Sequence, residues 1–178
     1  KGKTVVMYFG FTACPDVCPM ALSYLNGVLK DVEERDKVKV LFVSVDHKRD
    51  SPETVGKYVR FFNKDFIGLT GSQEQINKAV KKYNVYYRFI EMKNSGLNYT
   101  VDHTSRFFIV GPDGSLQKTI HSQEPSEVFK KQLLSNASNW RPNCYRPGTS
   151  SGTGRSPLVF AQGAEILRGL ATHARGIQ

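Results

Sequence analysis

Apolar positions in the first part of the chain follow two different spacings. Thr4–Phe9 is a continuous run of mostly β-branched and aromatic residues, which is typical of a buried strand. From Pro19 to about Glu34 the apolar residues recur at helical spacing, and Val38–Asp46 is again a strand-like run. A strand, a helix and a strand in this order predict a right-handed parallel unit, whose ligand sites lie beyond the carboxyl ends of the strands.

Shorter elements follow. Two helices are marked at their starts, because Ser51 precedes Pro52 as an N-cap and Ser72–Gln75 has the capping-box pattern. A short strand is expected at Phe66–Leu69, and an aromatic extended segment at Val85–Met92 is followed by a turn at Asn94–Gly96. Two further strands are expected at Tyr99–His103 and Arg106–Val110, and a turn at Gly111–Gly114 leads into the second hairpin strand at Leu116–Ile120. Ser126 is expected to cap a last helix that continues to Leu134. This order predicts an α/β thioredoxin-like fold, with a central mixed sheet flanked by helices.

The composition changes at the C-terminal end of this pattern. Thr149–Ser156 is rich in Ser, Gly and Thr, as flexible linkers are. Leu158–Ala174 is apolar enough for one amphipathic helix, but two glycines interrupt it. We therefore expect one domain over residues 1–140 and a flexible or poorly structured extension over residues 141–178, which contains Cys144.

Composition and charge exclude several classes of protein. The chain has 178 residues, 39% hydrophobic and 23% charged, which suits one globular domain with a sizeable core. Three cysteines, two of them clustered, are too few for a disulfide-stapled secreted domain. The net charge of +9 comes largely from scattered lysines on the polar faces of expected helices. A solvated basic surface is therefore favoured over nucleic-acid binding.

The most specific chemical feature is the pair Cys14 and Cys18 in the loop after the first strand. Pro15 and Pro19 disfavour helical geometry at the residues before them, so neither thiol is expected inside a helix. Pro19 is expected to be the first helical residue, and the helix start should lower both thiol pKa values. A redox pair, a soft-metal site and two buried thiols without a role are the alternatives. Three residues separate the cysteines, whereas the usual redox loop has two, and this difference favours a metal.

A metal held by two thiolates needs at least one more ligand. His47 lies in a charged loop, His121 ends a hairpin strand and His173 lies in the C-terminal extension, so all three are expected at the surface. His103 stands where an extended segment meets a core strand, and a thioredoxin-like fold brings that junction toward the first helix. Two thiolates and this imidazole would favour copper(I) or zinc over hard cations.

The sequence does not assign a single role to the charged residues near these positions. Asp102 could hydrogen-bond the metal-bound imidazole of His103, or it could be a strand-end cap or a turn residue. Asp46, Arg49 and Asp50 follow the second strand at the same edge of the sheet. We favour a solvated charge cluster for these three residues over a role at the site.

Five blocks of residues, in order across about residues 3–135, resemble the Sco/SenC copper chaperones. They are Gly10–Pro19; Phe42–Asp46 with Arg49 and Asp50; Gly68–Gly71; Tyr83–Tyr87; and Val101–Thr104 with Gly111–Gly114. The resemblance implies a thioredoxin-like domain that binds a copper ion through Cys14, Cys18 and His103. It also implies a role in assembling the binuclear copper site of cytochrome c oxidase. Where the family usually has a proline this chain has His47, which could add a metal-binding side chain or alter a turn.

The resemblance also implies partners and a location. The copper-bearing subunit of cytochrome c oxidase and other copper chaperones are the expected partners, no nucleic acid is expected, and a homodimer stays open. Eukaryotic members are tethered to the mitochondrial inner membrane and face the intermembrane space, and bacterial members face the periplasm. This sequence has no apolar run near the roughly 18 residues of a membrane span. It opens almost inside its first strand, so we expect N-terminal sequence, including the tether and a preceding hairpin, to be missing.

The sequence therefore predicts a copper metallochaperone. The alternative is a thiol-disulfide oxidoreductase, in which Cys14 and Cys18 reduce the copper-site cysteines of the oxidase subunit. The spacing of the two cysteines and the presence of His103 argue against this alternative, whereas the fold argues for it. Enzymatic activity other than such a reduction is not expected.

Overall fold

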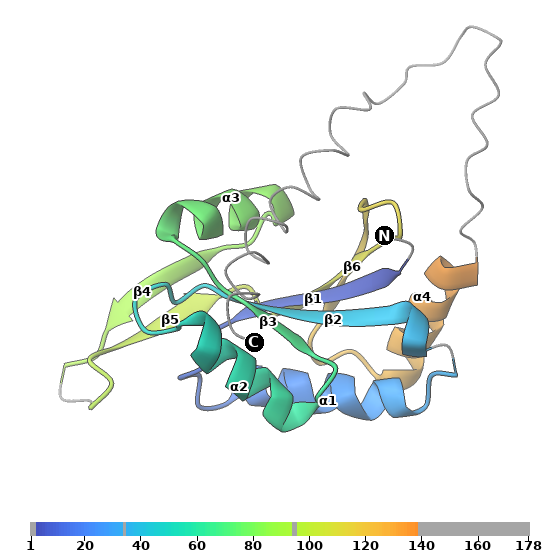
Figure 1. Ribbon diagram of the computed structural model, residues 1–178, viewed down its shortest axis with the longest axis horizontal. Coiled ribbons are helices and arrows are strands. Elements are labelled where there is room, and N and C mark those ends of the chain that lie inside the picture. Colours follow the sequence, from blue (N-terminus) through green and yellow to red (C-terminus); the bar gives the residue numbers. More distant parts are fainter. Residues whose placement is uncertain (1–2, 34, 94–95, 139–178) are drawn as a thin grey trace, which may run out of the picture.

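The computed structural model describes residues 3–33, 35–93 and 96–138. Figure 1 shows a twisted central sheet with helices on both of its faces. The elements in chain order are β1 (Thr4–Gly10), α1 (Val17–Lys30), a 3₁₀ turn η1 (Arg35–Lys37), β2 (Val38–Ser44), α2 (Pro52–Phe62), β3 (Ile67–Leu69), α3 (Gln73–Tyr83), β4 (Tyr87–Glu91), β5 (Tyr99–His103), β6 (Arg106–Val110), β7 (Leu116–His121) and α4 (Ser126–Ser138).

The central sheet has the strand order β3-β2-β1-β6-β7. β1 pairs in parallel with β2 and antiparallel with β6, so that Met7 lies opposite both Leu41 and Phe108. Val6–Phe9 is completely buried, as its apolar run predicts. β2 pairs in parallel with β3, and β6 forms an antiparallel hairpin with β7. The predicted α/β architecture, the parallel β1-α1-β2 unit and the later hairpin are therefore confirmed.

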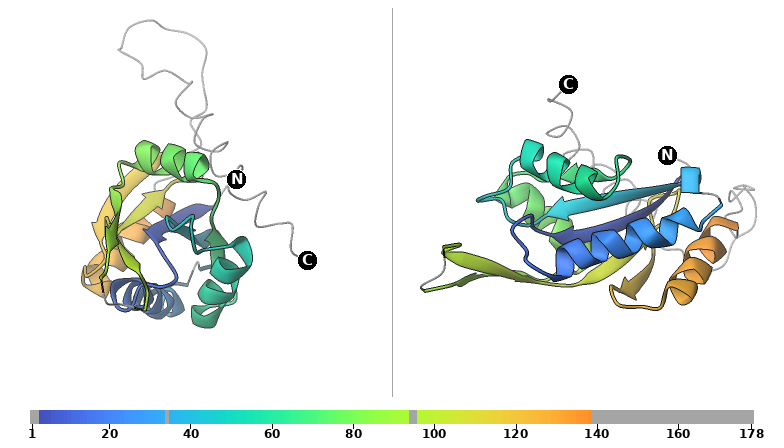
Figure 2. Two further views of the ribbon diagram at one scale, coloured as in Figure 1. Left: turned by 90° about the vertical axis from the view of Figure 1, so that its left-hand side faces the viewer. Right: turned by 90° about the horizontal axis from the view of Figure 1, so that it is seen from below.

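Alternate side chains of β1 pack against different helix layers. Tyr8 contacts Phe107 of β6, and Tyr24 of α1 stacks on the same ring at 5.9 Å between centroids. Phe9 points to the opposite face, where its ring lies 6.0 Å from that of Tyr83 in α3. The period of two along the strand thus divides the core between α1 on one face and α3 on the other (Figures 1 and 2).

β4 and β5 form a separate two-stranded antiparallel sheet, in which Tyr87 lies opposite His103. The sequence predicted both extended segments but not their pairing. Figure 2 shows this hairpin projecting beyond one end of the central sheet. β6 begins at Arg106, just after β5 ends, and runs antiparallel to β1. The end of β5 therefore lies beside the carboxyl end of β1, where the cysteine loop begins.

The start of α1 differs from the prediction. The helix begins at Val17, two residues before Pro19, so Cys18 lies in its first turn and only Cys14 stays in the loop. The expectation that neither thiol lies in a helix is wrong for Cys18. Pro19 is tolerated because it occupies the third helical position, where a backbone N–H would have no acceptor within the helix.

Two other boundaries also differ. α1 ends at Lys30 and not near Glu34. The apolar spacing continues past this end because Val32, only 3% exposed, joins the core from outside the helix. Ser126 is the first residue of α4 itself, whereas it was expected to cap the helix. The difference at Ser126 is a single residue, which is common at a helix end because the terminal turns are irregular.

Hydrogen bonds confirm both predicted helix starts. The hydroxyl of Ser51 accepts from the N–H of Thr54 at 3.1 Å, at the start of α2. At the start of α3, the Ser72 hydroxyl accepts from the Gln75 N–H while the Gln75 side chain accepts from the Ser72 N–H. These bonds satisfy backbone donors that a helix start leaves without partners.

Some predictions concern residues outside the described ranges. They include the extension over residues 141–178 with Cys144 and His173, and two residues of the expected turn, Asn94 and Ser95. Among the helices of the described ranges, none is both long and apolar enough to cross a bilayer.

Alanine substitutions at two glycines should change the free energy of unfolding in opposite directions. A Cβ on Gly68 in β3 would lie 2.8 Å from the backbone oxygen of Val55 in α2. Gly68→Ala should therefore lower the free energy of unfolding by about 1–3 kcal/mol, as overpacking does. A Cβ on Gly27, inside α1, would meet nothing within 4 Å, so Gly27→Ala should raise the free energy of unfolding by roughly 0.5–1 kcal/mol. Urea unfolding followed by circular dichroism measures both, and an unchanged or raised free energy of unfolding in Gly68→Ala would contradict the close packing of α2 on β3.

Candidate metal centre

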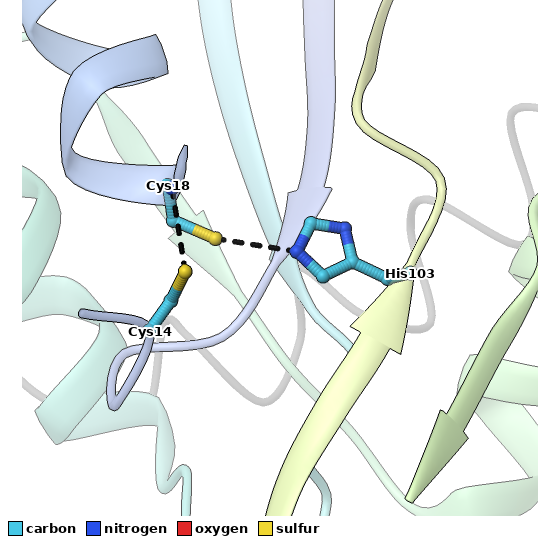
Figure 3. A group of neighbouring side chains, drawn as sticks. All are labelled: Cys14, Cys18 and His103. Atoms are coloured by element: carbon cyan, nitrogen blue, oxygen red, sulfur yellow. Dashed lines mark hydrogen bonds between the residues drawn. The ribbon is translucent and has the colours of Figure 1, made fainter. Parts of the chain in front are cut away.

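Three elements bring two thiols and an imidazole together (Figure 3). Cys14 lies in the loop after β1, Cys18 in the first turn of α1 and His103 at the end of β5. Cys18 Sγ lies 3.4 Å from His103 Nε2, and Cys14 Sγ accepts a hydrogen bond from the Cys18 N–H at 3.4 Å. One ligand atom from each residue lies within 4.8 Å of the other two. The fold thus gathers three residues that are separated by up to 89 positions along the chain.

Cys18 approaches β1 closely because Gly10, the last residue of the strand, has no side chain. A Cβ on Gly10 would lie 2.8 Å from Cys18 Sγ and 2.9 Å from the ring of Phe42. The Gly10 carbonyl oxygen accepts from the Val45 N–H at 2.8 Å, so the backbone there is held against the segment after β2. The thiol of Cys18 therefore occupies space that any other residue at position 10 would fill.

Aromatic rings form the walls of the site. The His103 ring meets those of Tyr8 and Phe11 edge-on, at 6.1 and 5.8 Å between centroids. Cys18 is fully buried, Cys14 is 9% exposed and His103 is partly buried. Water is thus excluded from one sulfur, while the other two ligand groups remain nearer the surface.

A backbone contact orients the imidazole of His103. Its Nδ1 lies 3.2 Å from the carbonyl oxygen of Thr104, which can only accept a hydrogen bond. Nδ1 therefore carries the proton, and the lone pair of Nε2 faces the thiols. Thr104 is held in turn by Tyr86, because each residue accepts from the other's backbone N–H at 3.0 Å. This orientation depends on a residue that the metal-ligand argument from sequence did not consider.

The two thiols differ in acidity because they interact with each other. Hydrogen bonding from Cys18, opposed in part by burial, lowers the pKa of Cys14 to about 4. The same interaction, together with burial, raises the pKa of Cys18. The pair therefore holds one thiolate at neutral pH, and a metal that binds both sulfurs displaces the remaining proton. The predicted lowering of both pKa values is correct in direction for Cys14 only.

Two sulfurs and one imidazole nitrogen suit a soft metal ion such as copper(I) or zinc. In the described ranges, no other group of three His, Cys, Asp or Glu side chains has converging ligand atoms. His121 is exposed at the end of β7, as predicted. His47 was expected at the surface; it is partly buried, meets the ring of Phe89 edge-on at 5.4 Å and lies outside the cluster.

The charged residues after β2 are not a solvated cluster, contrary to the prediction. Asp46 is fully buried and Asp50 is 6% exposed. Asp50 accepts hydrogen bonds from the N–H and the hydroxyl of Thr12, at 2.9 and 2.6 Å, and from the Ser44 hydroxyl. Asp46 forms an ion pair with Arg49 at 2.6 Å. Buried carboxylates need such partners, and here the partners connect the cysteine loop to the end of β2.

Asp102 does not orient the metal site. Its side chain is exposed and lies 4.0 Å from the guanidinium of Arg88 on β4. Successive residues of a strand face opposite sides, so the side chains of Asp102 and His103 diverge. Asp102 also lies within β5, one residue before its end, so it is neither a strand-end cap nor a turn residue. The partner of the imidazole is Thr104 instead.

Fold and site together define a thioredoxin-like α/β domain with a candidate soft-metal centre at the carboxyl end of β1. The family model described as SCO1/SenC matches residues 1–138 of this chain. The chain therefore belongs to the SCO1/SenC family, as the five blocks of residues indicated.

Two curated relatives illustrate the extent of the match. A SCO2-like protein of Rickettsia prowazekii is 33% identical over 138 residues, which cover 74% of this chain and 67% of the relative. The mitochondrial protein SCO2 of Saccharomyces cerevisiae is 34% identical over 139 residues, which cover 75% of this chain and 46% of the relative. The chain thus spans between about half and two thirds of the length of these relatives.

Solved structures of the family share the fold. ScoI of Arabidopsis thaliana, solved with copper bound, has a TM-score of 0.72 and 33% identity, and the match covers 78% of this chain and 86% of that one. BsSco has a TM-score of 0.59 and 26% identity, with 79% and 83% covered. BsSco is described as a member of the Sco family of cytochrome c oxidase assembly proteins with a disulfide switch.

A pH titration tests the unequal acidity of the thiols. In the reduced, metal-free protein we expect the Cys14 thiolate to form with a pKa of about 4. Cys18→Ala removes the stabilising interaction and should move this pKa toward the ordinary thiol value of about 8.5. Ultraviolet absorbance of the thiolate measures the change, and Cys14→Ser should abolish the titration at low pH. An unchanged pKa in Cys18→Ala would contradict the interaction between the two thiols.

Proposed function

We propose that this protein is a Sco-type copper metallochaperone, which holds a copper ion as cargo through Cys14, Cys18 and His103. The observation that carries the proposal is the convergence of the two Sγ atoms with His103 Nε2. Family membership supports it, because ScoI of Arabidopsis thaliana was solved with copper bound. The proposed cellular role is assembly of the binuclear copper site of cytochrome c oxidase, in keeping with the description of BsSco.

The donor atoms favour copper(I) as the cargo. Thiolate sulfur is a soft ligand, and the partly apolar walls formed by Tyr8 and Phe11 suit a complex of low charge. When copper(I) binds, Cys18 loses its proton and both cysteines coordinate as thiolates. The lone pair of His103 Nε2 provides the third ligand.

Release of the cargo follows from the different burial of the ligands. His103 is partly buried and Cys14 is the more accessible of the two sulfurs, so these are the ligands that thiolates of the acceptor displace first. Displacement of the fully buried Cys18 completes the exchange, with one bond to copper formed for each bond broken. The proposed acceptor is the copper-bearing subunit of cytochrome c oxidase, and another copper chaperone is the proposed source.

We assign this function to a domain over residues 1–140, with residues 141–178 as an extension to it. The site residues all precede the extension, and the family match ends at residue 138. The proposed location is the mitochondrial inner membrane, with the domain facing the intermembrane space, or the periplasm in a bacterium. Relatives from yeast mitochondria and from Rickettsia support these two settings.

Titration of the reduced protein with copper(I) tests the proposed ligands. About one ion should bind tightly, and His103→Ala should weaken binding by on the order of 100-fold, because loss of a ligand costs more than loss of an outer hydrogen-bond partner. Cys14→Ser and Cys18→Ser should weaken it further. His121→Ala is the matched control, since this exposed imidazole lies outside the cluster and should leave the affinity unchanged. Equal affinities of the wild type and His103→Ala would remove the histidine from the site.

A thiol-disulfide reductase is the second candidate, favoured by the closeness of the two sulfurs and by the disulfide switch of BsSco. In this reaction the Cys14 thiolate attacks an acceptor disulfide, and Cys18 then attacks the mixed disulfide. Two electrons pass to the acceptor as a Cys14–Cys18 disulfide forms. The burial of Cys18 disfavours the second step, because the attacking species must be a thiolate and burial disfavours the charged form.

A turnover assay separates the two candidates. We expect metal-free reduced protein to reduce an oxidised dicysteine peptide slowly, and the copper-loaded protein to transfer its ion to the reduced peptide. Ellman titration of the peptide follows the first reaction and copper analysis after separation follows the second. Fast metal-free turnover without copper retention would favour the reductase.

A further inference from the structure

The start of β5 is attached to the loop after β2 by an ion pair whose acid, Asp46, is fully buried. Asp46 accepts hydrogen bonds from Arg49 Nε at 2.6 Å and from the Tyr99 hydroxyl at 2.9 Å. Arg49 Nη1 donates to the backbone oxygen of Tyr99 at 3.1 Å and to that of Leu97 at 3.4 Å. These four bonds connect the loop after β2 to the strand that ends at His103.

The guanidinium of Arg49 also contacts two aromatic rings. Its central carbon lies 3.8 Å from the ring centroid of Tyr99 and 5.9 Å from that of Phe11. The ring of Phe11 meets His103 edge-on. Arg49 therefore reaches the histidine by two routes, one along the backbone of β5 and one through a ring packed on the imidazole.

The same loop is bonded to the cysteine half of the site. Asp50 accepts from the N–H and hydroxyl of Thr12, two residues before Cys14. The loop is closed on itself, because the Asp50 N–H donates to the Asp46 backbone oxygen at 2.9 Å. One short segment, residues 46–50, is thus hydrogen-bonded both to the cysteine loop and to the histidine strand.

The β4–β5 hairpin has particular need of such an attachment. In the described ranges it forms a sheet of its own and shares no strand pairing with the central sheet. Its position relative to β1 therefore depends on side-chain contacts and on the short connection to β6. A two-stranded hairpin is only marginally stable by itself, so the loss of a few contacts changes where its end lies.

We propose that the loop over residues 46–50 sets the distance between His103 and the cysteine pair, with Arg49 as the positioning residue for the histidine. The inference rests on the proposed copper site. Arg49 touches no ligand atom; it acts through β5 and through Phe11. A lysine cannot replace it, because a single ammonium group cannot donate to Asp46 and to two backbone oxygens in the planar arrangement of a guanidinium.

The test compares copper(I) affinities of the full chain and its Arg49→Lys variant, measured by competition with a chromophoric chelator. We expect a loss of about 10–100-fold, the range typical of groups that orient a metal ligand. The loss should disappear in the His103→Ala background, because Arg49 has no ligand left to position there. In the copper(II) complex, the nitrogen hyperfine signal in electron paramagnetic resonance should weaken in Arg49→Lys.

Two tyrosine variants extend the test: one should have a smaller effect on copper affinity, and the other is its matched control. Tyr99→Phe removes the hydrogen bond to Asp46 but keeps the ring under Arg49, so we expect a smaller loss of affinity than in Arg49→Lys. Tyr87→Phe removes a hydroxyl from the same hairpin, where it donates to Asn77 at 2.7 Å, and should leave the affinity unchanged. If Arg49→Lys does not fold, Tyr99→Phe in both His103 backgrounds provides the same comparison.

Distinct results would overturn the two proposals. Equal losses from Arg49→Lys with His103 present and absent would show a general structural effect and would overturn the positioning role alone. An unchanged affinity in Tyr99→Phe, with Arg49→Lys also unchanged, would do the same. If His103→Ala itself has no effect on affinity, the proposed ligand set fails, and the positioning role fails with it.

Discussion

The burial of β1 between β2 and β6 is the constraint on which the site depends. A strand paired on both edges and covered on both faces cannot shift, so its last residue, Gly10, holds a fixed place at the sheet edge. The missing side chain of Gly10 leaves room for the sulfur of Cys18. The same pairing brings the start of β6, and with it His103, to this edge. One buried strand thus locates proposed ligands that are 89 positions apart in the sequence.

The two halves of the proposed copper site are held differently. The cysteines belong to a loop and a helix start that pack directly on the core, whereas His103 ends a hairpin attached through polar and aromatic contacts. Cys18 is fully buried, and the other two ligands are nearer the surface. A firmly held sulfur combined with more accessible ligands suits a protein that retains its cargo until an acceptor replaces the outer ligands.

The buried acids of the loop over residues 46–50 stabilise the segments that surround the proposed copper site. Asp46 and Asp50 lie inside the protein because each accepts several hydrogen bonds, from Arg49 and Tyr99 and from Thr12 and Ser44. A buried carboxylate without partners would be strongly unfavourable, so these acids fix the positions of the groups that donate to them. They are therefore part of the geometry of the site although they supply no ligand atom.

The sequence by itself determined the α/β fold and the caps of α2 and α3, because apolar periodicity and capping patterns are local signals. The sequence also singled out Cys14, Cys18 and His103 as candidate ligands, through the cysteine loop and the resemblance of five blocks to the Sco/SenC family. It did not determine that Cys18 lies within α1, that β4 pairs with β5, or that Asp46 and Asp50 are buried. Asp102, adjacent to His103 in sequence, faces away from the site, whereas Arg49 reaches its strand from 50 positions before Tyr99. Contacts of this kind depend on how distant elements pack, and only the tertiary structure decided them.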